Sequence, residues 1–442
     1  MFEFGRELKK ALGANDALGE ADPCLLELLD VQALAARGRA GDIDAGRVSA
    51  KHPFPLWLRS AAVWREHARR TGDVLALRRA AAAAVSAGRC AASPAEQARA
   101  TLEQALTSLL GADLYGDEVL TGATRNSLKI AAATEADDLG GAKIEHAHAR
   151  LVSRDALACG DYAKALEAAA LFDCVVHKLD TLAAAHRCSA TRYEANLARI
   201  ERADLLAGFG ARLHDVKLLR RVEMNLAALL DQIDADYEPL LWVRGAEVLG
   251  AVETALGETQ GHPETMARGA AILSKALERF TREHSPLDWA RLQHALAVAL
   301  QSLGDATENR AIYLEAERAF EDALEVVDGT SLMLRAMTAS NRAACLARRA
   351  ERTGDLNALS VAETVFKGEA AKIDPNNDPV GWAVLQINLA RIYEARADLL
   401  GGFSNRDAAV YALEEAREVF CEHGLKTLAE SATAGLERVR AV

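Results

Sequence analysis

The sequence predicts an all-α protein built from repeated helical hairpins, and three observations support this prediction. Half of the 442 residues are apolar, and that share comes mainly from Ala and Leu, which favour helices. Aromatic residues make up only 5% and there are only 9 Pro, a balance that disfavours strands. A Pro-x-x-Trp pair recurs at 239/242, 286/289 and 379/382, and the offsets of 47 and 93 are close to one and two periods.

Five two-helix units follow from this period, from about residue 185 to the end. A degenerate copy, "SLMLRAMTASNRAACLARRAERTGD", fills the gap at 331–355, and an earlier copy begins at Arg192. Second helices are expected over 264–280, 311–327, 359–373 and 406–424. In the second of these, Ala316, Phe320, Ala323 and Leu324 share one helical face, as residues of a core do.

The ends of the first helices carry capping signals. Ser285 and Asp378 are expected to accept hydrogen bonds from free backbone N–H groups, with Pro286 and Pro379 at the first helical position. Trp289 and Trp382 stand in the first turns, where we expect them to close one hairpin against the next. At the opposite ends, the predicted C-caps are Gly304, Gly354 and Gly401.

These units resemble the tetratricopeptide repeat. The run "ACGDYAKALEAAALF" (158–172) is typical of its turn into the second helix, and a long-period bacterial variant begins Pro-Leu-x-Trp-Ala-x-x-Gln-x-x-Leu, as residues 286–296 do. The resemblance implies an α-solenoid, a right-handed superhelix of antiparallel hairpins whose first helices line the concave side. It implies three regions: a helical cap or partly ordered segment (1–50), divergent hairpins (51–184) and repeats of about 47 residues (185–442).

Composition excludes several classes of protein. A formal charge of −12 with no Lys/Arg-rich run disfavours nucleic-acid binding, and no stretch of about 18 uncharged apolar residues predicts a membrane span. The start, "MFEFGRELKKALG", is amphipathic without the apolar core of a signal peptide; it is expected to cap the array, with docking to a partner or a bilayer as the minor alternative. Without a predicted membrane span or signal peptide, a cytoplasmic location is expected.

Seven scattered cysteines are expected to be free, mostly buried thiols in a reducing compartment: Cys24, Cys90, Cys159, Cys174, Cys188, Cys345 and Cys421.

No motif indicates an enzyme, a cofactor or a metal. The chain lacks a phosphate-binding glycine loop, a Gly-x-Ser-x-Gly elbow and a His-Glu-x-x-His pair. Cys174, His177, His186 and Cys188 are residue types that bind zinc, but the last two would point about 200° apart on a helix, so a buried Cys beside surface His is the better interpretation. The five tryptophans are interpreted as packing residues, because three share one repeat position.

The resemblance implies a non-catalytic scaffold or adaptor that holds a peptide or helix of another protein in its concave groove. An acidic segment is expected, because the predicted groove positions are rich in Arg and Asn. The candidate groove residues, taken as outward-looking on the first helices, are Arg192, Asn196, Arg199, Arg244, Arg291, His294, Asn341, Asn388 and Arg391. Three alternatives stay open. The same residues pair with neighbours such as Glu194, Glu247 and Glu394 on a solvated face, or the array self-assembles into a homodimer, or, least favoured, the chain is an enzyme whose site no motif marks.

Overall fold

The computed structural model describes residues 23–134, 138–186, 189–371, 374–376, 379–401, 403–423 and 426–441. Within these ranges the chain forms nineteen helices and no strand. The amphipathic segment predicted at 1–13 lies outside the described residues, so its role stays a prediction. None of the described helices combines the length and the apolar character needed to cross a bilayer.

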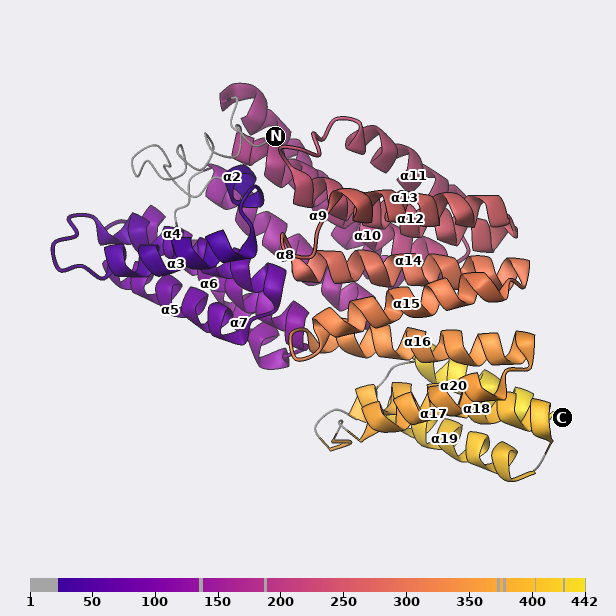
Figure 1. Cartoon of the computed structure of the whole chain (residues 1–442). Helices are drawn as coiled ribbons and strands as arrows, with labels where there is room; N and C mark the ends of the chain where they lie inside the picture. Colours follow the sequence, from indigo (N-terminus) through magenta and orange to yellow (C-terminus); the bar gives the residue numbers. More distant parts are fainter. Residues whose placement is uncertain are drawn as a thin grey trace.

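The helices follow one another with short connections along the whole described chain (Figure 1). In chain order they are α2 (Pro23–Glu27), α3 (Val31–Ala45), α4 (Pro53–Thr71), α5 (Val74–Cys90), α6 (Pro94–Tyr115), α7 (Glu118–Ala133), α8 (Asp138–Cys159), α9 (Tyr162–His186), α10 (Ser189–Arg212), α11 (Val216–Leu230), α12 (Pro239–Gln260), α13 (Pro263–Arg279), α14 (Pro286–Thr307), α15 (Arg310–Val327), α16 (Leu332–Thr353), α17 (Leu356–Ala370), α18 (Pro379–Leu400), α19 (Phe403–Glu422) and α20 (Lys426–Arg440).

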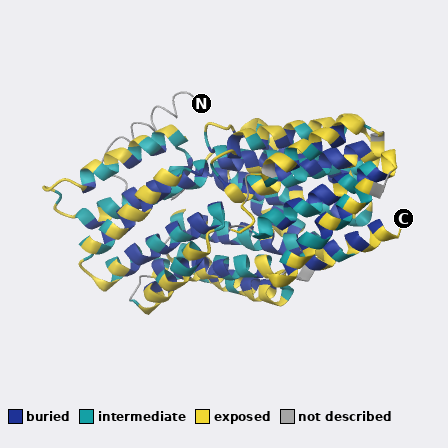
Figure 2. Ribbon diagram, turned by 90° about the horizontal axis from the view of Figure 1, so that it is seen from below, coloured by how far each residue is buried: buried dark blue, intermediate teal, exposed yellow. Residues whose placement is uncertain are grey.

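The helices pair into hairpins, α4 with α5 through α18 with α19, and the hairpins stack side by side. Each even-numbered helix from α4 to α18 also contacts the next even-numbered helix, so these helices form one continuous layer. Buried residues run along the stacked interfaces and exposed residues cover the outside (Figure 2). The all-α solenoid of tetratricopeptide-like hairpins that the sequence predicts is therefore confirmed.

The repeat punctuation is confirmed at most positions. Helices α12, α14 and α18 begin at Pro239, Pro286 and Pro379, and the four predicted second helices correspond to α13, α15, α17 and α19 within a few residues. Gly354 ends α16 in the left-handed conformation, with its N–H bonded to the Ala350 carbonyl. Gly401 follows α18 with a φ of 68°. Proline at the first position and glycine after the last are the expected helix signals.

Two capping predictions are wrong, and one lies outside the described residues. Ser285 precedes α14, but its hydroxyl donates to the Asp288 carboxylate at 2.6 Å and caps no backbone N–H. Gly304 lies inside α14, which continues to Thr307, and a Cβ at Gly304 would sit 3.3 Å from the Tyr313 ring. This glycine therefore serves a close approach of α14 and α15. Asp378 is not among the described residues.

The tryptophans pack as predicted, whereas the cysteines differ from the prediction. Trp64 is 2% exposed, and the remaining four are partly buried against apolar clusters. The five described cysteines are free thiols, but only Cys345 is buried. Cys159, Cys174 and Cys421 are exposed, because they lie on helix faces that are turned away from the neighbouring hairpins. The prediction of mostly buried thiols is wrong for this set.

The array closes on itself, which the sequence-based prediction of a superhelix of stacked hairpins did not include. Helix α4 contacts α14, and α6 contacts α16, although more than 200 residues separate each pair. Arg69 of α4 donates to both oxygens of Asp288 in α14, at 2.9 and 3.2 Å. One apolar cluster spans this junction and includes Trp64 and Leu110 on one side and Leu287 and Val327 on the other.

The tightest point of this closure is Gly72, at the end of α4. Its φ of 69° is left-handed, and a Cβ there would lie 2.4 Å from the backbone carbonyl oxygen of Thr330. Tyr115 of α6 donates to the Gly72 carbonyl at 2.7 Å, and Ser331 donates to the Leu114 carbonyl at 3.4 Å. Only glycine lets the α4 and α15–α16 backbones approach this closely.

Gly72→Ala tests the closure against Gly354→Ala, a matched control. Both glycines end a helix in the left-handed conformation, but no atom lies within 4 Å of a Cβ at Gly354. We expect Gly354→Ala to lower the free energy of unfolding by about 1 kcal/mol through backbone strain alone. Gly72→Ala should cost about 1–3 kcal/mol more, because the Thr330 backbone must move. Urea unfolding measures both, and equal losses would contradict the closure.

Candidate functional site

A cavity of about 270 Å³ opens on the layer of even-numbered helices, between α4, α6, α8, α10 and α12; we call it the inner cavity. Its apolar lining includes Leu58, Leu102, Leu106, Leu139 and Leu197. Its ionisable side chains are Arg59, Arg65, Arg69, Arg99, Lys143, Arg150 and Arg244, with Glu66, Glu103, Glu194 and Glu201, and His146. Seven Arg and Lys side chains thus face four carboxylates, on a chain whose formal charge is −12.

His146 bridges two helices at the cavity wall. Its Nδ1 lies 2.6 Å from Glu194 Oε1 and its Nε2 lies 2.7 Å from Glu201 Oε2, so α8 is tied to α10 at two points. Burial disfavours the charged imidazolium, but Glu201 and Glu194 outweigh this effect and raise the pKa of His146 to about 9. The ring is therefore protonated at neutral pH, and both of its nitrogens donate.

Arginine–carboxylate pairs fix the rest of the wall. Arg65 of α4 holds Glu103 of α6, and Arg150 of α8 lies 3.3 Å from Glu201. Burial opposes ionisation of Glu66, yet Arg69 and Arg70 hold its pKa well below the usual value. These pairs are enclosed by the ring of helices, so salt and water screen them less than pairs on an open surface. Most charged groups of the cavity are thus positioned before any ligand arrives.

One cation of the cavity, Lys143, is not held in this way. Among the described residues, Lys143 has no carboxylate within ion-pair distance and acts on Glu194 only through space. The Arg99 guanidinium lies over the Phe54 ring, 5.9 Å from its centroid. Both neighbour the leucine surface of α6 and α8. The wall therefore offers positive charge next to apolar area, a combination that suits an acidic segment with apolar side chains.

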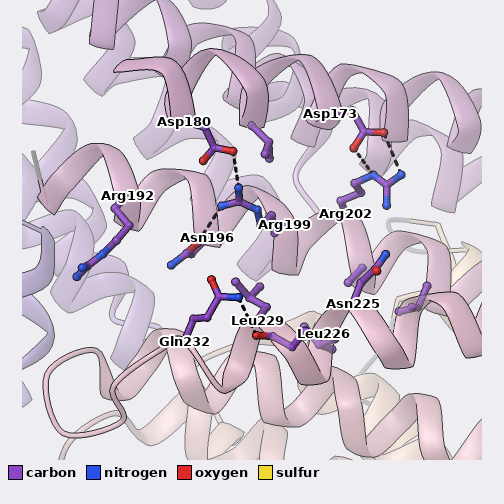
Figure 3. A pocket seen from close by; sticks show the side chains of 14 residues that line it. Asp173, Asp180, Arg192, Asn196, Arg199, Arg202, Asn225, Leu226, Leu229 and Gln232 are labelled. Atoms are coloured by element: carbon purple, nitrogen blue, oxygen red, sulfur yellow. Dashed lines mark hydrogen bonds and ion pairs between the residues drawn. The ribbon is translucent and has the colours of Figure 1, made fainter. Parts of the chain in front are cut away.

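Arg192, Asn196 and Arg199 lie on the face of α10 opposite to the inner cavity. With residues of α9 and α11 they line an outer cleft of about 580 Å³, shown in Figure 3. There Arg199 donates to Asp180 and to Asn196, and Arg192 donates to Glu238 at 3.0 Å. Of the nine predicted groove residues, only Arg244 lines the inner cavity, where its Nε lies 3.7 Å from Asp288.

The prediction of outward-looking side chains is wrong for His294 and Asn388, which are 9% and 8% exposed, whereas Asn196, 7% exposed, lines the outer cleft. The reason is visible in the repeat: Asn341 Nδ2 lies 3.4 Å from His294 Nε2, and Asn388 donates to Ser340. Each of these bonds joins residues 47 or 48 positions apart, one repeat period. In these two repeats, the side chain at this position therefore joins the first helix of the repeat to the first helix of the previous repeat. Burial lowers the pKa of His294 to about 4, so its ring is neutral.

Arg291 and Arg391 are exposed, as predicted for groove residues. Arg291 acts electrostatically on Asp204 of α10 and Glu247 of α12, and burial raises the pKa of Glu247 to about 7 against this effect. Arg391 lies near Arg348 and Arg438, with Glu351 and Glu394 as its acidic neighbours. Neither residue reaches the inner cavity, so their binding roles stay predictions.

Sequence reasoning missed the residues that line the inner cavity from α4, α6 and α8, the helices in which the repeat has diverged most. The available signal was a row of ionisable residues one helical turn apart, such as Arg65 and Arg69, or His146 and Arg150. For zinc, Cys174 and His177 are exposed on α9, and Cys188 is outside the described residues. No group of three metal-binding side chains occurs in the described part of the chain.

The fold and the inner cavity define a tetratricopeptide-like helical repeat protein. No protein-family model and no curated protein matches the sequence. Among solved structures, a Rap protein complexed with competence and sporulation factor is 12% identical, with 86% of this chain and 98% of that chain covered and a TM-score of 0.49. A circular tandem repeat protein with novel repeat topology is 15% identical, with 94% and 97% covered and a TM-score of 0.25.

The bridge through His146 predicts a pH dependence of stability. The folded-state pKa is raised above the ordinary value of 6.5, so the stabilisation is fully present below about pH 6.5 and is lost as the pH rises through about 9. Over this pH range the free energy of unfolding should fall by about 3 kcal/mol in total. His146→Gln should remove this part of the pH dependence of unfolding, whereas His148→Gln, an exposed residue of the same helix, should keep it. Identical profiles for both variants would contradict the bridge.

Proposed function

We propose that this protein is a non-catalytic interaction scaffold that binds an acidic, leucine-containing segment of a partner protein in the inner cavity. The observation that carries the proposal is that seven Arg and Lys side chains and the protonated His146 outnumber four carboxylates beside a leucine surface, on a chain that is acidic as a whole. An acidic segment is attracted to this patch, whereas the net negative charge of the whole chain disfavours its binding elsewhere.

The ion pairs of the wall support this proposal because they lower the cost of binding. Arg65, His146 and Arg150 are already held by carboxylates from neighbouring helices, so little side-chain freedom remains to be lost. Lys143 is the cation left to pair with the partner. Leu106 and Leu197 are partly exposed at the cavity and offer apolar contact. Charge then selects the segment, and apolar burial supplies much of its affinity.

Self-assembly through the end of the array has less support. The outer face of α20, which ends the described chain, carries Glu430, Glu437, Arg438 and Arg440, and no large hydrophobic residue of α20 is exposed. Such a polar face is typical of a repeat that caps a solenoid against stacking. Homodimerisation stays a prediction that light scattering can test.

Selection from a library of random 12-residue segments tests the proposed function. We expect the enriched segments to be acidic and rich in leucine, and to lose at least tenfold in affinity against Lys143→Glu and against Leu106→Asp. Lys129→Glu is the matched control, because Lys129 is exposed on α7 away from the cavity and carries the same charge. Enriched segments that bind all of these chains equally, or that are basic, would rule out the inner cavity.

A further inference from the structure

The short helix α2 and the two leucines after it lie on the inner wall, at one end of the inner cavity, where Leu26 is part of the lining. The Glu27 side chain is 1% exposed. Its Oε1 accepts from the Tyr193 hydroxyl at 2.8 Å, and its Oε2 accepts from the backbone N–H groups of Leu240 and Leu241 at 3.1 and 3.3 Å. A carboxylate from the start of the chain thus caps the N-terminus of α12.

Side chains of the wall also bind the main chain of this segment. Arg70, which is fully buried, donates to the carbonyls of Leu26, at 2.7 Å, and of Leu29. His284 Nε2 lies 2.6 Å from the Glu27 carbonyl oxygen. These partners come from α4 and from the loop before α14, 41 to 257 residues away. The contacts therefore match those of a bound peptide, whose carbonyls and one acidic side chain are recognised by a preformed wall.

The wall has donors that need such a ligand. Glu238, the residue before α12, makes no side-chain cap, so Glu27 supplies the acceptor for two N–H groups of the first turn. The positive end of the helix dipole lies at the same place and favours an anion there. Without the segment, Arg70 would stay charged and buried with Glu66 as its remaining partner. Emptying the site is therefore costly unless another acidic segment fills it.

The segment itself is held less firmly than the number of bonds suggests. Burial raises the pKa of Glu27 to about 7, against the lowering effect of the Tyr193 hydrogen bond. The cost of removing this carboxylate from water thus offsets part of the energy of its hydrogen bonds. Its main-chain partners recognise no particular sequence, so a segment from another protein can make the same bonds.

We propose that this wall is a binding site for a short helical segment of the type Leu-Leu-Glu-Leu-Leu, that residues 25–29 of this chain fill it in cis, and that a partner segment of the same chemistry displaces them. Leu26 borders the inner cavity, so the displacing segment continues into the leucine and cation surface described above. This inference rests on the proposed function and names the ligand class of its site.

The test uses a fluorescent peptide with the sequence of residues 22–32, with Ser in place of Cys24, added to full-length chains. Wild type should bind it weakly, because its own segment competes. Glu27→Ala, which weakens the cis segment and leaves the wall intact, should bind it at least tenfold more tightly. Glu278→Ala, an exposed carboxylate of α13, is the matched control and should behave as wild type. A peptide with Gln at the Glu27 position should lose at least tenfold against the Glu27→Ala chain.

Hydrogen exchange of the wild-type chain gives a second measurement that needs no variant. Saturating peptide should speed amide exchange at residues 25–30, while the Gln peptide should leave it unchanged. Equal affinities of wild type and a folded Glu27→Ala chain, or exchange at 25–30 that the peptide does not alter, would overturn the inference. If library-selected segments still depend on Lys143 in that case, the proposed function stands without the cis segment; if no segment binds, the proposed function falls as well.

Discussion

The contact of α4 with α14 is the constraint on which the rest of this structure depends. Arg69 lies between Glu66 of its own helix and Asp288 of α14, and an apolar cluster surrounds the junction. Asp288 is buried, yet Arg69 and Arg244 hold its pKa well below the usual value, so the pair is ionised. Removing one partner would leave a buried charge without compensation, which costs far more than the net value of the pair.

This contact turns a row of hairpins into an enclosed site. With α4 held against α14, the first helices of the repeats face one another around the inner cavity, and their charged side chains lie close together on its wall. The pKa of His146 is raised by Glu201 and Glu194, and the pKa of Glu66 is lowered by Arg69 and Arg70, in both cases against the effect of burial. On the same turn of α4, Arg69 binds Asp288 of α14 and Arg70 binds the main chain of Leu26 and Leu29. One helical turn thus makes both the ring closure and the contact with the α2 segment.

The sequence predicted the modules well, because each module is defined by local signals. Pro239, Pro286 and Pro379 mark helix starts for reasons that lie within a few residues. The closure could not be predicted in this way, since it joins residues 219 positions apart and depends on how a small rotation per repeat accumulates over five hairpins. The burial of His294 and Asn388 could not be predicted for a related reason, and the binding roles of the candidate groove residues stay predictions. Asn341 and Asn388 were candidates for an outward-looking face, but their side chains contact His294 and Ser340 of the previous repeat.

The left-handed glycine that lets α4 meet the α15–α16 connection has an evolutionary consequence. Open solenoids gain and lose repeats by duplication and deletion, because each repeat contacts only its neighbours. Between α4 and α14 that freedom is lost: one hairpin more or fewer would carry Gly72 and Arg69 past Thr330 and Asp288. Related proteins should therefore vary in repeat number after α16, where the array continues beyond the ring, and keep the number within it constant.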